Sequence, residues 1–188
     1  LVEQHVAHER ILFERLSEGW RTNFVPLIDE IVLPDRICND DEKLFMLSSL
    51  GFDIDFREGE SGVRASVRSV PDALIAIVGI ECIGDALVTL SSSTSGKANT
   101  VDEAAAMISC RHAVKNGVHL TTKHMQAILN QLMSCQSPHT CPHGRPIFLE
   151  LGQRDLASVF RRPWISTSRT QNRGKRSRGS VREILDGL

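Results

Sequence analysis

The strongest constraint on folding lies between Pro138 and Pro146, a short stretch that contains three prolines. Proline lacks a backbone N–H and fixes its φ angle, so this stretch cannot form an α-helix. Proline also disfavours α geometry in the residue before it, which applies to Cys141 and Arg145. Side chains at i and i+2 of an extended segment point the same way. We therefore expect Cys141 and His143 to converge as metal ligands do, the alternative being a turn that holds both residues by chance.

The apolar spacing from His5 to Gly19 predicts an α-helix that ends at the glycine. His5 and Glu9 are four residues apart, so their side chains share one face of the first turns. A histidine and a carboxylate in this arrangement suit a metal ion, although solvated polar faces show the same spacing. Glu3 precedes the helix, where the helix dipole favours a carboxylate whether or not it also has a catalytic role.

The remaining pattern predicts a mixture of helices and strands. Residues from Pro163 onward are rich in Ser, Arg and Gly and are expected to be disordered. The other expected elements are a strand at 29–34, a helix at 40–50, a hairpin of 52–57 with 63–69, a loop at 91–100, helices at 102–116 and from 121 or 122 to 134, a strand at 147–151 and a short helix ending at 160.

Cys110 lies on the predicted helix 102–116 among several alanines, which allow another element to pack closely. It is interpreted either as a core thiol or as a further ligand. Arg111 beside it could offset a carboxylate or hold a phosphate. The other cysteines (38, 82 and 135) are expected in the core, and the other histidines (8, 112, 119, 124 and 139) at the surface or in packing contacts.

The composition is that of a globular protein, with 41% hydrophobic and 24% charged residues. Residues 161–188 carry a net charge of +6 and the rest of the chain −7. The basic tail could bind DNA through counterion release, or it could be a solvated chain end. The most apolar run, 73–83, is too short to span a bilayer, so no membrane partner is expected.

The chain shows no secretion signal, and its five cysteines have no regular disulfide spacing. We therefore expect a cytoplasmic protein whose thiols are reduced. The chain begins without methionine, on two apolar residues that would suit the end of a buried strand. We expect it to be a fragment of a longer protein.

Four short motifs in the same order resemble the C-terminal endonuclease and dimerisation domain of MutL-type DNA mismatch-repair proteins. The segment Glu3 to Glu9, followed by Glu14, is similar to the family motif Asp-Gln-His-Ala-x2-Glu-x4-Glu. Ser109 to Arg111 resembles Ala-Cys-Arg, Cys141 to Pro146 matches Cys-Pro-His-Gly-Arg-Pro, and Phe160 to Arg162 fits Phe-x-Arg. The resemblance covers residue 1 to about residue 164.

The resemblance implies a site for one or two divalent ions, zinc or manganese, that nicks one strand of DNA. The metal ligands carried over by motif are His5, Glu9, Cys110, Cys141 and His143. Glu3 and Glu9 are the expected catalytic carboxylates, and Arg111 and Arg145 the expected DNA contacts. ATP would bind only in an N-terminal domain outside this chain.

The resemblance also implies partners and an architecture. The expected partners are DNA, a second copy of the chain, a MutS-type mismatch sensor and a sliding clamp. The fold would be α+β and two-lobed: residues 1–26 with 142–164 form a dimerisation lobe, 27–141 an external lobe, and 165–188 a basic disordered tail.

Three residues depart from the family motifs. Glu3 replaces an aspartate, Val6 replaces an alanine, and Asp29 replaces the glutamine that leads the sliding-clamp motif ending at Pro34. A displaced carboxylate at position 3 favours an alternative: a catalytically weak dimerisation and docking module with a structural or regulatory zinc. A metal-sensing regulator that binds DNA without cleaving it is a third, more distant hypothesis.

Overall fold

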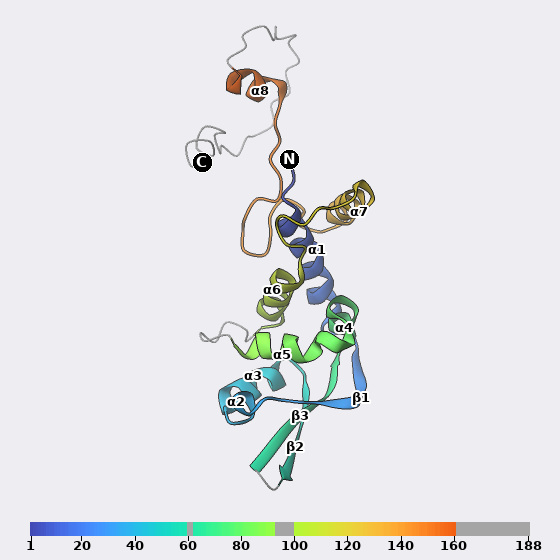
Figure 1. Ribbon diagram of the computed structural model, residues 1–188, viewed down its shortest axis with the longest axis vertical. Helices are drawn as coiled ribbons and strands as arrows, with labels where there is room; N and C mark the ends of the chain where they lie inside the picture. Colours follow the sequence, from blue (N-terminus) through green and yellow to red (C-terminus); the bar gives the residue numbers. More distant parts are fainter. Residues whose placement is uncertain (60–61, 93–99, 161–188) are drawn as a thin grey trace. The chain divides into compact units, whose positions relative to one another are not determined.

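A computed structural model describes residues 1–59, 62–92 and 100–160 (Figure 1). They divide into two compact units: Val2–Phe148, and Leu1 together with the segment from Leu149. The larger unit combines helices with a three-stranded antiparallel sheet, so the predicted α+β class is confirmed. In the smaller unit, the backbones of Leu1 and Leu149 pair, and helix α8 spans Gln153–Val159.

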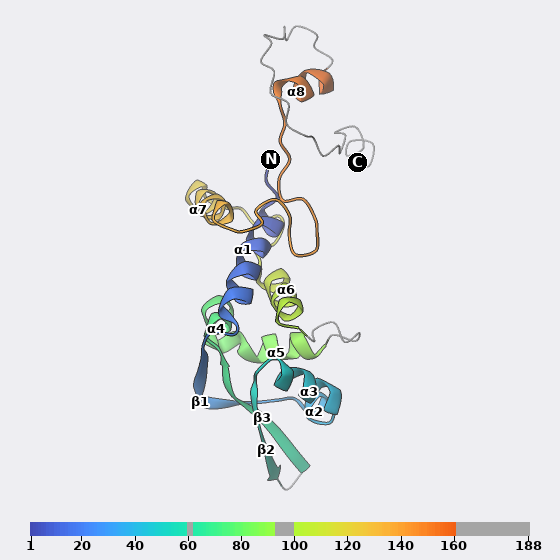
Figure 2. The ribbon, with the colours of Figure 1, turned by 180° about the vertical axis from the view of Figure 1, so that it is seen from behind.

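Helix α1, Gln4–Gly19, passes through the middle of the larger unit, as Figures 1 and 2 show from opposite sides. Its buried positions recur at helical spacing, and both ends of the helix contact other elements. The first half packs against α6 (Val101–His112) and α7 (Thr122–Met133), and the last turns lie near α4 (Asp72–Val78). This helix therefore links the two apolar clusters of the unit.

The larger cluster lies between the sheet and a layer of helices. Strands β1 (Phe24–Val32), β2 (Asp53–Gly59) and β3 (Gly62–Pro71) are ordered β1-β3-β2. Trp20 is fully buried there: its indole N–H donates to the Leu50 carbonyl, and its ring meets Phe52 edge to face. The helices that complete this layer are α2 (Asp35–Cys38), α3 (Asp41–Ser49), α4, the 3₁₀ turn η1 (Ile80–Cys82) and α5 (Ile83–Ser91).

The smaller cluster joins the start of α1 to α7 and to the proline-rich segment. It consists of six buried residues: Val6, Ala7, Ile11, Leu132, Cys141 and Ile147. Cys141 is thus packed among aliphatic side chains, where a cysteine behaves as a small apolar residue. The apolar packing fixes the position of the Cys141 backbone beside the first turns of α1.

Several predicted elements are confirmed, and the reasons are local. Asp40 caps α3 by accepting the Lys43 N–H, and Gly51 follows the helix with a positive φ of 91°. The β2–β3 hairpin, helix α7 behind its Thr121 cap, the non-helical 138–146 segment and α8 also match. The predicted loop at 91–100 and the tail from 163 lie largely or wholly outside the described residues.

Two boundaries and one strand were predicted wrongly. Strand β1 begins at Phe24 rather than residue 29, because Pro26 is tolerated on an edge strand and the regular pairing with β3 is interrupted after it. Helix α6 ends at His112 rather than 116, because Ala113 turns to extended geometry (ψ 150°). Residues 147–151 form no strand: Phe148 makes only an isolated bridge with Val2, and no longer ladder is present in the described chain.

Within the described residues no single helix is long and apolar enough to cross a membrane; only the sharply bent pair Asp72–Val78 and Ile80–Ser91 passes that test together, at an angle of 96°. The lobe boundaries at 26/27 and 141/142 stay predictions.

Candidate metal centre

Five side chains from three segments meet near the first turns of α1. His5, Glu9 and Cys110 offer ligand atoms that all lie within 4.8 Å of one another, and Glu9, Cys141 and His143 do the same. These are the five residues that the motifs indicated as ligands. Glu9 belongs to both groups, so the arrangement can serve one ion or two neighbouring ions.

Glu9 is the centre of the arrangement and is fully buried. Its Oε1 lies 2.7 Å from His143 Nδ1, which is an ion pair when the imidazole is protonated, but neither carboxylate oxygen has a hydrogen bond of good geometry within the described chain. A buried carboxylate whose hydrogen bonds are incomplete is costly unless a cation, either a protonated imidazole or a metal ion, offsets its charge. The Glu9 carboxylate is therefore built to face a cation.

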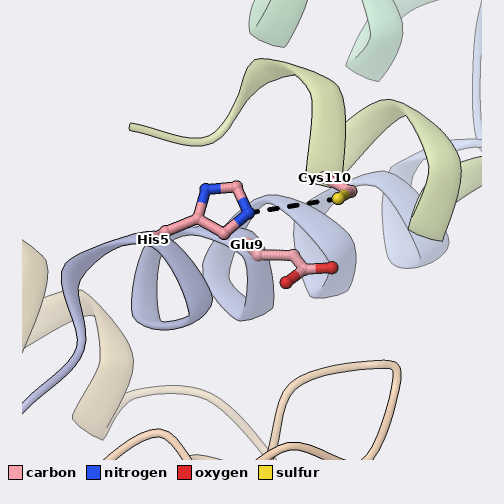
Figure 3. A group of neighbouring side chains, drawn as sticks. All are labelled: His5, Glu9 and Cys110. Carbon is pink, nitrogen blue, oxygen red and sulfur yellow. Dashed lines mark hydrogen bonds between the residues drawn. The ribbon is translucent and has the colours of Figure 1, made fainter. Parts of the chain in front are cut away.

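His5 and Cys110 face each other across the α1–α6 contact (Figure 3). The distance from His5 Nε2 to Cys110 Sγ is 4.0 Å. Tetrahedral zinc bonds to nitrogen and sulfur place such atoms roughly 3.6 Å apart, so a small adjustment admits an ion. His5 Nδ1 lies 3.0 Å from the Val114 carbonyl, and donating that proton leaves Nε2 free as a ligand.

The Cys110 thiol is half-buried. Burial raises its pKa, and the negative charge of Glu9 raises it further, whereas Lys115 and Arg145 lower it. A cation between these side chains would act against the first two effects. The mixed set of imidazole, thiol and carboxylate fits a borderline-soft ion such as zinc and can also accommodate other divalent metals.

Cys141 and His143 converge by a different route from the one expected. The segment is not extended: the Gly144 N–H donates to the Cys141 carbonyl at 2.9 Å, which closes a turn with Pro142 at its second position. Gly144 completes the turn with a φ of +81°. The expectation of extended geometry was wrong, since proline also favours this turn position, but both side chains still reach Glu9.

Glu3 is placed outside both groups of ligands. Its two carboxylate oxygens accept the backbone N–H groups of His5 and Val6, at 3.0 and 2.7 Å, and so cap α1. Glu3, which was predicted to be catalytic, therefore serves as the N-cap of α1. Its catalytic role stays a prediction, as do the DNA contacts of Arg111 and Arg145, which are both exposed.

Several side chains that sequence reasoning did not select hold the ligand-bearing segments. Gln4 donates to the carbonyls of Lys115 and Val118. His8, expected only as a surface or packing residue, accepts the Val114 N–H at 3.0 Å. Burial lowers the pKa of His8, and the nearby charges of Arg15 and His5 lower it further.

Arg10 and Glu14 are a second pair missed as functional residues, although Glu14 belongs to the first motif. Arg10 is almost fully buried and donates to the Thr140 carbonyl, while Glu14 accepts N–H groups from Gln136 and Ser137. Their spacing in the sequence could have identified them. Arg10 and Glu14 are four residues apart, so they share one face of the helix, and Arg10 directly follows the ligand Glu9.

Residues 1–120 match the family model described as the MutL C terminal dimerisation domain. The chain is 40% identical over 166 residues to the DNA mismatch repair protein MutL of Microcystis aeruginosa, covering 88% of this chain and 27% of that protein. The MutL proteins of Rippkaea orientalis and Pelotomaculum thermopropionicum are 38% and 36% identical, over 88% and 86% of the chain and 27% of each protein. The chain thus spans about a quarter of the length of these relatives.

Proposed function

This chain belongs to the family of MutL C-terminal dimerisation domains, and from that premise we propose that it is a metal-dependent DNA-nicking domain that acts in mismatch repair. The observation that carries the proposal is the fully buried Glu9 carboxylate, which has no hydrogen bond of good geometry in the described chain and lies between two pairs of metal-ligand side chains. His5, Glu9, Cys110, Cys141 and His143 would hold one or two zinc or manganese ions.

A divalent ion supplies Lewis acidity, which lowers the pKa of water and offsets negative charge on a phosphoryl group. The protein's own contribution is placement of the donors. His5 and Glu9 come from one rigid helix, Cys110 comes from a second helix packed against it, and His143 comes from a tight turn. Ligands fixed in this way undergo little reorganisation when the ion binds.

DNA would approach from the exposed side of the site. His143, Arg145 and Arg111 are exposed, whereas Glu9 and Cys141 are buried. Arginine pairs well with phosphate oxygens because its guanidinium group donates two parallel hydrogen bonds. The two arginines would hold the DNA backbone without reading its sequence.

The partners of the domain follow from the same premise and are part of the proposal. The domain would pair with a second copy of itself, and the complete protein would work with a MutS-type mismatch sensor and with a sliding clamp. In the segment of the clamp motif, Val32 is exposed and Leu33 is buried, so only part of that segment is available for docking. ATP control would lie in a different domain.

The engagement of Glu3 as a helix cap favours a second candidate function. A carboxylate whose two oxygens already accept backbone N–H groups is poorly available for handling water or a second ion. The domain would then be a dimerisation and docking module whose zinc is structural or regulatory. Its metal would have a closed set of ligands with no position for exchange.

Nicking of supercoiled plasmid DNA with Mn²⁺ distinguishes these functions. The comparison uses the parent chain, Glu9→Ala and Glu3→Asp, with Glu18→Ala as an exposed control on the same helix. The nuclease proposal predicts nicking by the parent and by Glu18→Ala that is lost in Glu9→Ala. Absence of nicking in the parent and in Glu3→Asp, with zinc still bound, would support the docking module instead.

A further inference from the structure

The turn that carries Cys141 and His143 is connected to α1 by polar side chains that are not ligands. Glu14 accepts the N–H groups of Gln136 at 2.7 Å and of Ser137 at 3.0 Å, one at each carboxylate oxygen. One turn earlier on the helix, Arg10 Nε donates to the Thr140 carbonyl at 2.6 Å. Together the two side chains hold three backbone groups in the five residues before Cys141.

Arg10 is itself fixed in place. Its side chain is 8% exposed, its guanidinium carbon lies 5.2 Å from the centre of the Phe13 ring, and its Nη1 lies 3.7 Å from Glu14 Oε1. A buried arginine that is held on several sides loses little further entropy in donating a hydrogen bond. The pair therefore forms a rigid polar clasp, defined here as Arg10 and Glu14.

The clasp leads directly to the ligand turn. Thr140, which Arg10 holds, is bridged to Pro146, and the Cys141 N–H donates to the Arg145 carbonyl at 2.9 Å. These contacts close the loop that contains His143. A displacement of Thr140 would therefore shift the adjacent Cys141 and the turn that carries His143.

We propose that Arg10 and Glu14 are positioning residues that hold residues 136–140 on α1 and so place Cys141 and His143 beside Glu9 before any metal binds. This inference rests on the proposed metal site. Glu14, the last glutamate of the first motif, would then set the geometry of the site without binding the ion. Support of ligands by non-ligand residues typically changes metal affinity 10–100-fold.

The test measures Zn²⁺ affinity of the full chain by competition with a chromogenic chelator. Glu14→Gln keeps the size of the side chain but leaves one backbone N–H facing an amide NH₂. Arg10→Met keeps the apolar stem and removes the donor to Thr140. Glu18→Gln, on the exposed face of the same helix, is the matched control. We expect Zn²⁺ affinity to fall about 10-fold in the two clasp variants and less than 2-fold in the control.

A second readout separates positioning from a general loss of stability. With saturating Co²⁺, the parent should show thiolate-to-metal charge-transfer absorption from both Cys110 and Cys141. The clasp variants should lose part of this band while hydrogen exchange of the α6 amides stays unchanged. If one of the two clasp variants, Glu14→Gln or Arg10→Met, is too unstable to be measured, the other variant decides the result.

The outcomes distinguish the two proposals. If Glu9→Ala loses Zn²⁺ while both clasp variants keep the parent's affinity and Co²⁺ spectrum, the clasp proposal is overturned and the metal site stands. If the parent binds no Zn²⁺, or if Glu9→Ala binds it as the parent does, both proposals are overturned. Lower affinity and an altered spectrum in the clasp variants alone, with the control unchanged, support the clasp.

Discussion

Cys110 and the pair Cys141–His143 reach the same carboxylate from segments that are held by different forces. Cys110 is part of a regular helix whose buried face packs into the large apolar cluster. Cys141 and His143 lie on an irregular turn that is held by a cluster of only six buried residues and by hydrogen bonds from α1. The position of Cys110 is therefore insensitive to the loss of any single contact. The positions of Cys141 and His143 depend on each of a few polar contacts.

The largest expected effect comes from a matched pair of cavity mutations. Ile108 and Ile147 are both fully buried, the first in the large cluster and the second in the small one. Ile108→Ala should lower the free energy of unfolding by about 4 kcal/mol, and Ile147→Ala by about 2 kcal/mol, because a small, partly exposed cluster can collapse around the cavity. Chemical denaturation without metal measures both values.

The same two variants should rank in the opposite order for metal affinity. Ile147 follows the ligand turn, and its side chain packs in the same small cluster as Cys141, so its truncation loosens Cys141 and His143. Zn²⁺ affinity should fall more in Ile147→Ala than in Ile108→Ala. Equal losses of affinity would show that the two ligand-bearing segments are held in the same way.

A smaller stability effect is expected at Glu9, and its sign is unusual. Replacing this buried carboxylate by methionine removes an ionisable group that has no hydrogen bond of good geometry in the described chain, and it gives up only the contact with the exposed His143. Glu9→Met should raise the free energy of unfolding of the metal-free protein by roughly 1–3 kcal/mol and abolish stabilisation by Zn²⁺. Thermal unfolding with a chelator and with Zn²⁺ measures both, and a less stable metal-free variant would show that Glu9 is satisfied without an ion.

The smallest effect concerns Cys135, which lies beside the clasp. Burial, followed by the charge of Glu14, raises the pKa of Cys135 to about 11. Since the thiolate is the reactive form, iodoacetamide should alkylate Cys135 slowly at pH 8 in the folded chain and faster as the pH rises toward 11. Glu14→Gln should lower this pKa and speed alkylation at pH 8. A rate unchanged by that substitution would place the Glu14 charge away from the thiol.

The sequence was sufficient for features that depend on local rules. The spacing of apolar residues located α1, the predicted starts of α3 at residue 40 and of α7 at residue 121 or 122 match their caps, and the motifs identified the five side chains that the structure brings together. The β2–β3 hairpin followed from alternating polarity. Each of these signals lies within one short segment.

Features that depend on contacts between distant segments were not predictable in the same way. The early end of α6 accompanies imidazole contacts from His5 and His8, more than 100 residues earlier in the chain, to the backbone of Val114. The turn at Cys141 and the clasp of Arg10 and Glu14 also depend on how the proline-rich segment lies on α1. Nothing in the local sequence specifies those pairings.

The central claim is that both segments supply ligands to the ion held at Glu9, and X-ray absorption of the Zn²⁺-loaded chain tests it most directly. The account predicts sulfur at about 2.3 Å together with nitrogen or oxygen at about 2.0–2.1 Å. Cys110→Ser and Cys141→Ser should each remove part of the sulfur signal. A shell of nitrogen and oxygen alone in the parent, or a sulfur signal that neither substitution changes, would contradict it.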